Sequence, residues 1–268
     1  MKIKKAQLVL NEAGITAELG KTRKNGKEKS CLSIGNGRVR PTVYDESIEN
    51  IDSNEELIGF VNEIISNAPD VDVEVLTSVD FVKDHVVSCV RHVTDDDTII
   101  KFPVYNDLEE YFRIKIGDTD DYSMSTVVTT QLLANIGIDA DELRSIARHN
   151  LRAQVKIQPM IKVLADMMEV SAEDLADMSA IDDMMYVATT NSKTNGAAIM
   201  LLDDVLDSFC IEKGIKTLCI IPSSIHEVLL IPAETNEDDI NNMITDVNAT
   251  QVAEHERLSN HCYYHTLA

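Results

Sequence analysis

Residues 220–232 read IIPSSIHEVLLIP, two apolar runs on either side of a polar corner at 223–227. Aliphatic runs bounded by turn residues predict two strands joined as a hairpin. The corner holds two hydroxyls, an imidazole and a carboxylate. These residue types suit a hydrolytic site, and they are equally typical of an ordinary turn. The stretch therefore predicts a hairpin in the C-terminal part of the chain and leaves its chemistry open.

The elements around this hairpin predict one α/β module. A strand at 184–190 is followed by a helix at 196–213, which Gly214 closes. After the hairpin come a helix at 237–248 and a last strand at 261–267. This β-α-β-β-α-β order is that of a ferredoxin-like split βαβ unit. We therefore expect a mostly antiparallel sheet with its helices on one face.

The first half of the chain shows further local patterns. Residues 15–44 predict a β-meander that turns at Asn25-Gly26, a dipeptide typical of a type I′ hairpin. Alternation at 71–77 predicts a strand, and the apolar spacing at 79–92 predicts a helix. Two strands flank 106–108, so the middle elements follow an order similar to that of the C-terminal module. Other helices are expected at 53–65, 127–136, ending at Gly137, and 139–150, capped by Asp139.

These patterns predict an α+β fold of two α/β modules with mostly antiparallel sheets, the C-terminal one ferredoxin-like (βαββαβ), plus a small N-terminal β-meander. The Met-rich, acidic stretch between the modules is expected to be helical. The predicted organisation is a basic β-rich segment at 1–50, a middle α+β module at 51–155, an acidic helical connector at 156–183 and a ferredoxin-like module at 184–268.

Charge is distributed unevenly along the chain, whose formal net charge is −22. Residues 1–44 hold ten basic and three acidic residues, whereas the other 224 residues hold 14 basic and 43 acidic ones, a net of −29. Such a surface repels nucleic-acid phosphates and anionic membranes and attracts basic proteins. It serves either to keep molecules apart in solution or to imitate a nucleic acid. Aromatic residues are 4% and Trp is absent, which argues against a base-stacking or sugar-binding platform.

The five cysteines are widely spaced and include no C-x-x-C pair. This usage predicts free, mostly buried thiols in a reducing compartment. The first residues start basic, but their apolar run is too short for a signal peptide. No stretch approaches the roughly 20 apolar residues that a membrane span needs. We therefore expect a cytoplasmic protein.

Five stretches of the chain follow one another in a recognisable order and spacing: RPTVY at 40–44, ARHN at 147–150, MYVATTNSKTNGAAIML at 185–201, IIPSSIHEVLLIPA at 220–233 and DVNATQVAEHERLS at 246–259. Together they resemble the clostridial family known as domain of unknown function 5688. The resemblance covers nearly the whole chain and is strongest from Met185 onward. It implies a cytoplasmic protein, and the family offers no activity, cofactor or catalytic residue to carry over.

The corner at 223–227 admits three interpretations. Catalysis would use Ser224, His226 and Glu227 as nucleophile, base and orienting acid. Neighbours on a strand point to opposite faces, however, and the G-x-S-x-G elbow is missing. The alternatives are a turn in which Ser223 and Ser224 bond local backbone N–H groups, or a binding surface. We prefer the turn and assign no catalytic residue.

A second polar loop, 191–196, joins a predicted strand to a predicted helix. Backbone N–H groups at the helix start, with Asn191 and Lys193 nearby, suit a bound anion. The loop lacks both G-x-G-x-x-G and G-K-[ST], and Asn195 at the N-cap explains it as a capped turn. In a ferredoxin-like sheet this loop and the hairpin need not lie at the same end, so they count as separate binding candidates.

Arg144, Arg148 and Arg152 recur at every fourth position and form the one basic stripe outside the N-terminus. They are expected either to pair with acids of the same chain or to bind a partner's carboxylates or phosphates.

The tail contains residue types that bind zinc, but it lacks the C-x-x-C pair of a structural site. A closing strand places its cysteine on the face opposite two of its histidines. No metal and no cofactor are therefore expected. The residues are His255, His261, Cys262 and His265.

The function we expect is that of a non-catalytic acidic interaction or regulatory protein of bacterial or mobile-element origin. Its partner would be a basic protein, and a nucleic-acid-mimicking inhibitor of the anti-CRISPR type is the specific form. The alternative is a hydrolase or small-molecule-binding protein centred on the hairpin. The sequence names neither the partner nor the oligomeric state.

Overall fold

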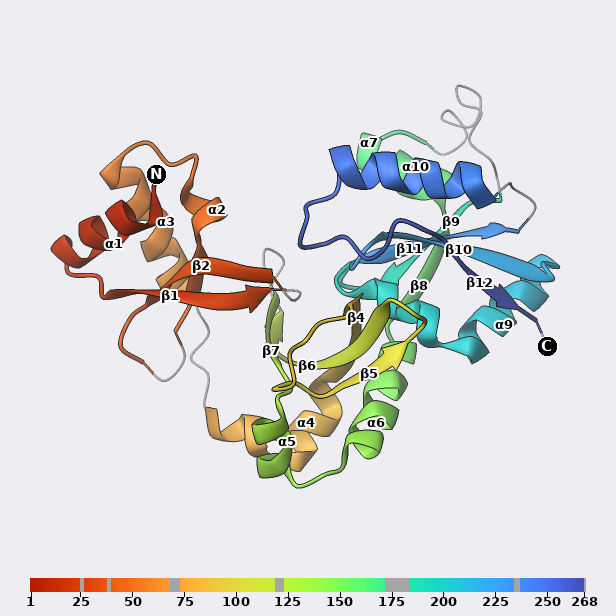
Figure 1. Ribbon diagram of the computed structural model, residues 1–268, viewed down its shortest axis with the longest axis horizontal. Coiled ribbons are helices and arrows are strands. Elements are labelled where there is room, and N and C mark those ends of the chain that lie inside the picture. The colour runs from red at the N-terminus through yellow and green to blue at the C-terminus, as the bar shows by residue number, and fades with distance from the viewer. Residues whose placement is uncertain are drawn as a thin grey trace. The chain divides into compact units, whose positions relative to one another are not determined.

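The computed structural model describes residues 1–24, 27–37, 40–67, 73–118, 123–171, 184–233 and 237–267. The chain divides into two compact units, Met1–Ser78 and Val79–Ala268. Both contain helices and mostly antiparallel sheets, which confirms the α+β class (Figure 1). No helix in the described ranges is long and apolar enough to cross a membrane.

The first unit is a three-stranded antiparallel meander with helices packed against it. Leu10, Leu32 and Leu57, from a helix, a strand and a second helix, are buried together in its core. The predicted meander is confirmed, while its Asn25-Gly26 turn lies outside the described residues. The strand expected at 71–77 is wrong over its described part, which is a 3-10 helix. The elements are α1 (Ile3–Glu12), β1 (Ala17–Lys24), β2 (Lys27–Ile34), β3 (Thr42–Tyr44), α2 (Asp45–Ile48), α3 (Asn54–Asn67) and η1 (Val73–Thr77).

The second unit begins with a four-stranded sheet in which β6 pairs with each of the other strands. The helix expected at 79–92 is correct only to His85, because the rest is strand β4. All residues of β4 except the last are buried, so its apolar side chains do not alternate and fit helical spacing by coincidence. The elements are α4 (Val79–His85), β4 (Val86–His92), β5 (Lys101–Val104), β6 (Leu108–Asp118), β7 (Ser123–Val127), α5 (Thr130–Ile136) and α6 (Ala140–Arg152).

Helix ends in this unit follow the capping chemistry of the sequence. The Asp139 side chain accepts a hydrogen bond from the Glu142 backbone N–H and begins α6 as predicted. Gly137 ends α5 in the left-handed conformation, with φ of 82°.

A five-stranded antiparallel sheet in the order β12-β10-β11-β9-β8 completes the second unit. The predicted β-α-β-β-α-β order from β9 to β12 is present. Residues 156–159 belong to β8, so the stretch expected to be helical is helical only from Met160 in its described part. The elements are β8 (Val155–Pro159), α7 (Met160–Met168), β9 (Tyr186–Thr190), η2 (Gly196–Leu201), α9 (Asp203–Lys213), β10 (Thr217–Ser224), β11 (Glu227–Pro232), α10 (Glu237–Thr250) and β12 (Tyr263–Thr266).

Helices cover both faces of this sheet, so the expected arrangement with helices on one face is wrong. On β10, Cys219 and Ile221 pack against α10, whereas Leu218 and Ile220 pack in the cluster that includes η2 and α9. Figure 1 shows α10 and α9 on opposite sides of the sheet. The apolar run of β10 has no polar face because both of its faces are buried.

The strand pairing also differs in one respect from a ferredoxin-like sheet, where the last strand of the unit pairs with the first. Here β12 pairs with β10, the second strand, and β9 pairs with β11 and β8. The difference concerns strand neighbours, which element order along the chain does not specify.

One hydrophobic core joins the two sheets of the second unit. Residues of η2 are buried together with Val90 of β4, Leu108 of β6 and Leu151 of α6. At the edge of this core, the Tyr105 ring lies 4.5 Å from that of Tyr263, centroid to centroid. The segment 79–268 therefore packs as a single body.

Candidate functional site

The hairpin corner and the 191–196 loop, which were expected to be separate binding candidates, lie against each other. The backbone N–H of Gly196 donates a hydrogen bond to the carbonyl oxygen of His226 at 3.0 Å. The hydroxyl of Thr189, at the end of β9, donates to the same oxygen at 2.8 Å. The N–H of Ala197 donates to the carbonyl of Ile225 at 3.3 Å. The two polar segments therefore form one junction.

Gly196 allows this close approach because it has no side chain. A Cβ atom at this position would lie 2.5 Å from the His226 carbonyl oxygen and 2.6 Å from Cα of Thr189. Both neighbours are backbone atoms, which cannot rotate away as a flexible side chain can. The glycine of the TNG sequence thus marks a packing contact, and η2, whose residues are all buried, begins at the same point.

The imidazole of His226 is held by the loop on one side and faces a carboxylate on the other. Its Nδ1 accepts a hydrogen bond from the Asn195 backbone N–H at 3.3 Å. Its Nε2 lies 3.6 Å from Oε1 of Glu256, and Nε2 of His255 lies 3.6 Å from the same oxygen. The accepting role of Nδ1 places the ring proton on Nε2, toward Glu256.

Of the two serines of the corner, Ser224 bonds a local backbone N–H as the turn interpretation predicts, whereas Ser223 bonds a neighbouring side chain instead. The Ser224 hydroxyl accepts a hydrogen bond from the His226 backbone N–H at 3.0 Å. The Ser223 hydroxyl donates to Oε1 of Glu227 at 3.3 Å. Among the described residues, neither hydroxyl hydrogen-bonds to the His226 ring, so the structure does not assemble a serine–histidine pair here.

The loop itself is held in an uncommon backbone conformation. Lys193 and Asn195 have φ of 55° and 54°, in the left-handed region. The hydroxyl of Thr190 accepts from the Thr194 N–H at 3.2 Å and donates to the Thr194 carbonyl at 2.9 Å. Asn195 occupies the predicted N-cap position, but its side chain makes no capping bond. That capping prediction is wrong because the left-handed backbone, held by the hairpin, replaces the extended conformation of a capping residue.

Bonds from Gln154, which lies between α6 and β8, and from Lys115 of β6 support the other side of the loop. The Asn191 backbone N–H donates to the Gln154 carbonyl at 2.9 Å. The ammonium group of Lys115 donates to the Gln154 side chain at 3.1 Å and to the Ser192 hydroxyl at 3.4 Å. The loop thus connects both sheets of the second unit, and several of its backbone and hydroxyl groups bond within the chain.

The arginine stripe of α6 pairs largely with a carboxylate inside the protein. Glu110 of β6 has no solvent-exposed surface and accepts hydrogen bonds from Nε of Arg144 at 2.7 Å and from Nε and Nη2 of Arg148 at 2.9 and 2.8 Å. The Ser88 hydroxyl adds a fourth bond at 2.9 Å. The Arg144 guanidinium also lies over the ring of Phe102. Two of the three stripe residues therefore neutralise a buried acid.

Arg152, the last residue of the stripe, makes a bidentate pair with Asp204 of α9. Its Nε and Nη2 donate to the two carboxylate oxygens at 2.8 and 2.9 Å. These hydrogen bonds lower the pKa of Asp204 below its ordinary value. The pair joins α6 to α9 across the second unit.

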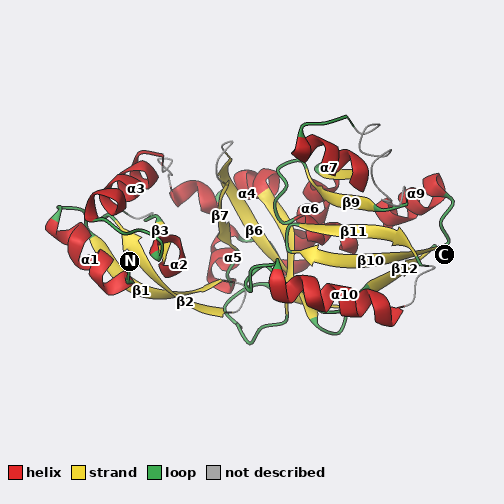
Figure 2. Cartoon of the chain, turned by 90° about the horizontal axis from the view of Figure 1, so that it is seen from above, coloured by secondary structure: helices red, strands yellow, loops and turns green. Residues whose placement is uncertain are grey.

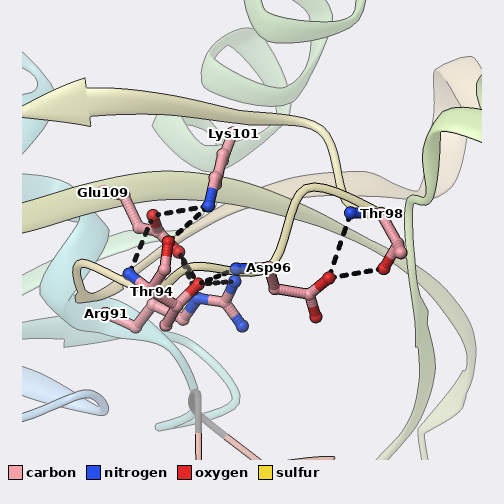
Figure 3. Close-up of polar contacts among 6 residues, drawn as sticks. All are labelled: Arg91, Thr94, Asp96, Thr98, Lys101 and Glu109. Atoms are coloured by element: carbon pink, nitrogen blue, oxygen red, sulfur yellow. Dashed lines mark hydrogen bonds and ion pairs between the residues drawn. The ribbon is translucent and has the colours of Figure 1, made fainter.

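A second buried carboxylate, which the sequence analysis missed, lies on the opposite face of the same strand. Glu109 accepts hydrogen bonds from Nε of Arg91 at 2.7 Å and from the Thr94 hydroxyl at 2.8 Å (Figure 3). Lys101 Nζ lies 3.6 Å from its other oxygen. Adjacent residues in a strand point to opposite faces of the sheet. Two neighbouring acids within a buried strand, Glu109 and Glu110, therefore indicate two separate buried carboxylates, each with its own partners.

The tail residues bond to different partners and do not gather. Nε2 of His261 lies 3.1 Å from Oδ2 of Asp107, and Nε2 of His265 lies 2.8 Å from Oδ1 of Asp207. Cys262 packs under α10, on the face opposite His265. The described residues include no group of three His, Cys, Asp or Glu side chains that could hold a metal ion.

The predicted burial of the cysteines is confirmed, because all five thiols are free and buried. Burial raises the pKa of Cys89 to about 12. Burial and the neighbouring Cys262 raise the pKa of Cys219 to about 12. Thiols held in the protonated form are poor nucleophiles, so neither cysteine suits catalysis.

The model of the family of unknown function DUF5688 matches residues 4–266. The chain belongs to this family. The match spans both units and agrees with the resemblance found in the sequence. Comparison with curated proteins and with solved structures gives no match. Membership in DUF5688 assigns no role to any residue, so function has to be argued from the geometry.

Proposed function

We propose that this DUF5688 protein is a non-catalytic binding protein whose acidic second unit recognises a basic protein partner. The observation that carries the proposal is a charge imbalance at the surface. Residues 79–268 contain 14 Lys and Arg against 33 Asp and Glu. The pairing of these residues decides how much of the imbalance is left for a partner.

Many basic side chains of this unit form ion pairs with acids of the same unit. Five of its cations pair with Glu109, Glu110 and Asp204, the first two of which are buried, and Lys83 and Lys213 pair with exposed glutamates. The stripe that offered a site for anions is therefore largely occupied by the chain's own acids. The five cations are Arg91, Lys101, Arg144, Arg148 and Arg152.

The acidic side chains, by contrast, lie mainly on the surface. Exposed acids occur on α4, α6, α7, α9 and α10 and in the loop after β4. A field of one sign steers oppositely charged partners toward the protein and raises the association rate. Residues in exposed positions include Asp84, Asp95, Asp97, Asp141, Asp166, Glu212, Glu237, Asp238, Asp239 and Asp246.

The hairpin geometry supports binding over hydrolysis. Ser224 and the His226 ring each bond backbone N–H groups, which are structural roles. A hydrolase would need a serine hydroxyl within hydrogen-bond reach of the ring. A nucleic-acid mimic is a narrower form of the proposal and rests on charge alone. It predicts that DNA competes for the partner and that salt weakens the complex.

Affinity capture from a bacterial lysate tests the proposal at low and high salt. The wild-type chain is expected to retain basic proteins that salt releases. A variant that neutralises five exposed acids should lose them, whereas a variant with Asp and Glu exchanged at the same positions should keep them. Retention of the same proteins by the neutralised variant would contradict the proposal. The neutralised positions are Glu212→Gln, Glu237→Gln, Asp238→Asn, Asp239→Asn and Asp246→Asn.

A further inference from the structure

Helix α7 is apolar on almost every side and yet lies at the surface. Seven of its nine residues are apolar, and Met167 and Met168 are 74% and 60% exposed. Val170, just after the helix, is also exposed. An amphipathic surface helix normally turns its apolar residues toward the core and its charges toward water. These side chains therefore present apolar surface at the exterior of the second unit.

Helix α10 presents a second exposed apolar pair, Met243 and Val247, one helical turn apart. The opposite flank of α10 faces the edge strand, because the Asn241 side chain accepts a hydrogen bond from the Cys262 N–H at 2.9 Å. Met243 and Val247 are consequently on the flank toward β11 and β9.

The two helices lie on the same side of the five-stranded sheet. Helix α7 contacts β8 and β9, and α10 contacts β10. Figure 1 shows both helices on the side opposite α9, and Figure 2, seen from above, shows them over different strands of the sheet. Leu229 and Ile231 of β11, which are half-buried, belong to the same face. The exposed residues of two patches, Met167, Met168 and Val170 on the β8–β9 side of β11 and Met243 and Val247 on its β10 side, are together called the methionine face below.

We propose that the methionine face binds a basic amphipathic helix of a partner protein. The inference rests on the proposed function and names the surface and the chemistry of the partner. Methionine side chains are flexible and polarisable, so they fit apolar side chains of varied shape. An amphipathic helix inserts apolar side chains spaced by one turn into such a surface.

Charge complementarity specifies the sign of that partner. Exposed acids lie beside the apolar residues on both helices, Asp166 and Glu169 at the end of α7 and Asp246 on α10. Lys162 is the one basic residue of α7, and α10 has none. A partner helix with lysine or arginine along its edges would place those cations next to the acids.

Fluorescence anisotropy with labelled peptides tests the proposal on the full chain. The probes are a helix-forming Leu/Lys peptide with an apolar face, a scrambled peptide of the same composition, and oligolysine of the same charge. The amphipathic peptide is expected to bind at least about tenfold more tightly than the other two. Equal affinity for all three peptides would refute the proposal that the methionine face binds an amphipathic helix. It would not contradict the proposed binding of a basic protein by the acidic unit.

Variants locate the contact without changing the charge. Met167→Ser with Met168→Ser, and Met243→Ser with Val247→Ser, should each weaken the amphipathic peptide about tenfold and leave oligolysine unchanged. The control is Ile211→Ser, because Ile211 is 67% exposed and belongs to α9, the helix on the other side of the sheet (Figure 1). An unchanged affinity in both double variants would refute the proposal, as would an equal loss in the control. The lysate capture, which varies acids only, judges the proposed function separately.

Discussion

The carbonyl oxygen of His226 accepts a hydrogen bond from the backbone N–H of Gly196 at 3.0 Å. This bond fastens the β10–β11 hairpin to the start of η2, whose residues are all buried in the core shared by both sheets. The polar corner is thereby part of the framework of the second unit. His226 holds the loop in place through its backbone carbonyl, which accepts from Gly196, and through its ring, which accepts from the Asn195 N–H.

Replacement of Gly196 by alanine should destabilise the protein strongly. The added Cβ would lie 2.5 Å from the His226 carbonyl oxygen, and the backbone would have to shift to admit it. Overpacking of this kind costs about 1–3 kcal/mol and here also weakens the hydrogen bond. Urea unfolding followed by circular dichroism measures the free energy of unfolding.

The matched control is Gly59→Ala, in the exposed part of α3. Apart from the backbone of its own helix, no atom lies within 4 Å of a Cβ at that position, and alanine favours helix more than glycine does by about 1 kcal/mol. That substitution should be neutral or stabilising. A Gly196→Ala protein as stable as the wild type would show that the junction is looser than the structure has it.

Substitution of Glu110 by glutamine should cost about 3–5 kcal/mol of unfolding free energy, because it leaves the guanidinium groups of Arg144 and Arg148 without their counter-ion. The carboxylate is fully buried and accepts four hydrogen bonds. Chemical denaturation gives the value. Glu142→Gln on α6 is the comparison, since that glutamate is exposed and pairs with Lys83 at 3.0 Å. It should change stability by less than about 1 kcal/mol.

The Arg152–Asp204 pair predicts a pH-dependent contribution to stability. Hydrogen bonds from Arg152 lower the pKa of Asp204, so the folded state favours the charged carboxylate. The contribution is present above the unfolded pKa of Asp204 and is lost as pH falls through the lower folded pKa. Both side chains are largely exposed, so solvent limits the effect to about 1 kcal/mol or less.

Arg152→Ala should therefore raise the pKa of Asp204 toward its ordinary value, which an NMR titration of that carboxyl measures. The variant should be less stable than wild type near neutral pH and equal to it below the folded pKa. An unchanged Asp204 titration in the variant would argue against the bidentate pair.

The cysteines should be unreactive in the folded protein. Burial raises the pKa of Cys89 and of Cys219 to about 12, so thiolate is scarce at neutral pH. A thiol-specific chromogenic reagent should react slowly with the native chain and rapidly with all five thiols after denaturation. A rapid native reaction at one cysteine would reveal an exposed thiol.

Local chemistry in the sequence predicted the elements that depend on neighbours along the chain. Gly137 and Asp139 ended and began helices as expected, and the runs at 220–232 formed a hairpin. Capping and turn preferences involve a few adjacent residues, which makes them readable from sequence. The helix prediction for residues 79–92 was wrong in its second part, because a strand buried on both faces has no alternation of apolar and polar residues to distinguish it from a helix.

The sequence by itself determined the α+β class, the N-terminal meander, the acidic charge and the family, because each depends on composition or on order along the chain. Only the tertiary structure decided that the corner and the loop meet, that helices cover both faces of the C-terminal sheet, and that Glu110 occupies two arginines of the basic stripe. Those outcomes arise from contacts between residues far apart in the chain. A carboxylate loses its hydration on burial and needs hydrogen-bond donors in place of the water. Which arginines supply them depends on the tertiary packing that brings α6 next to β6.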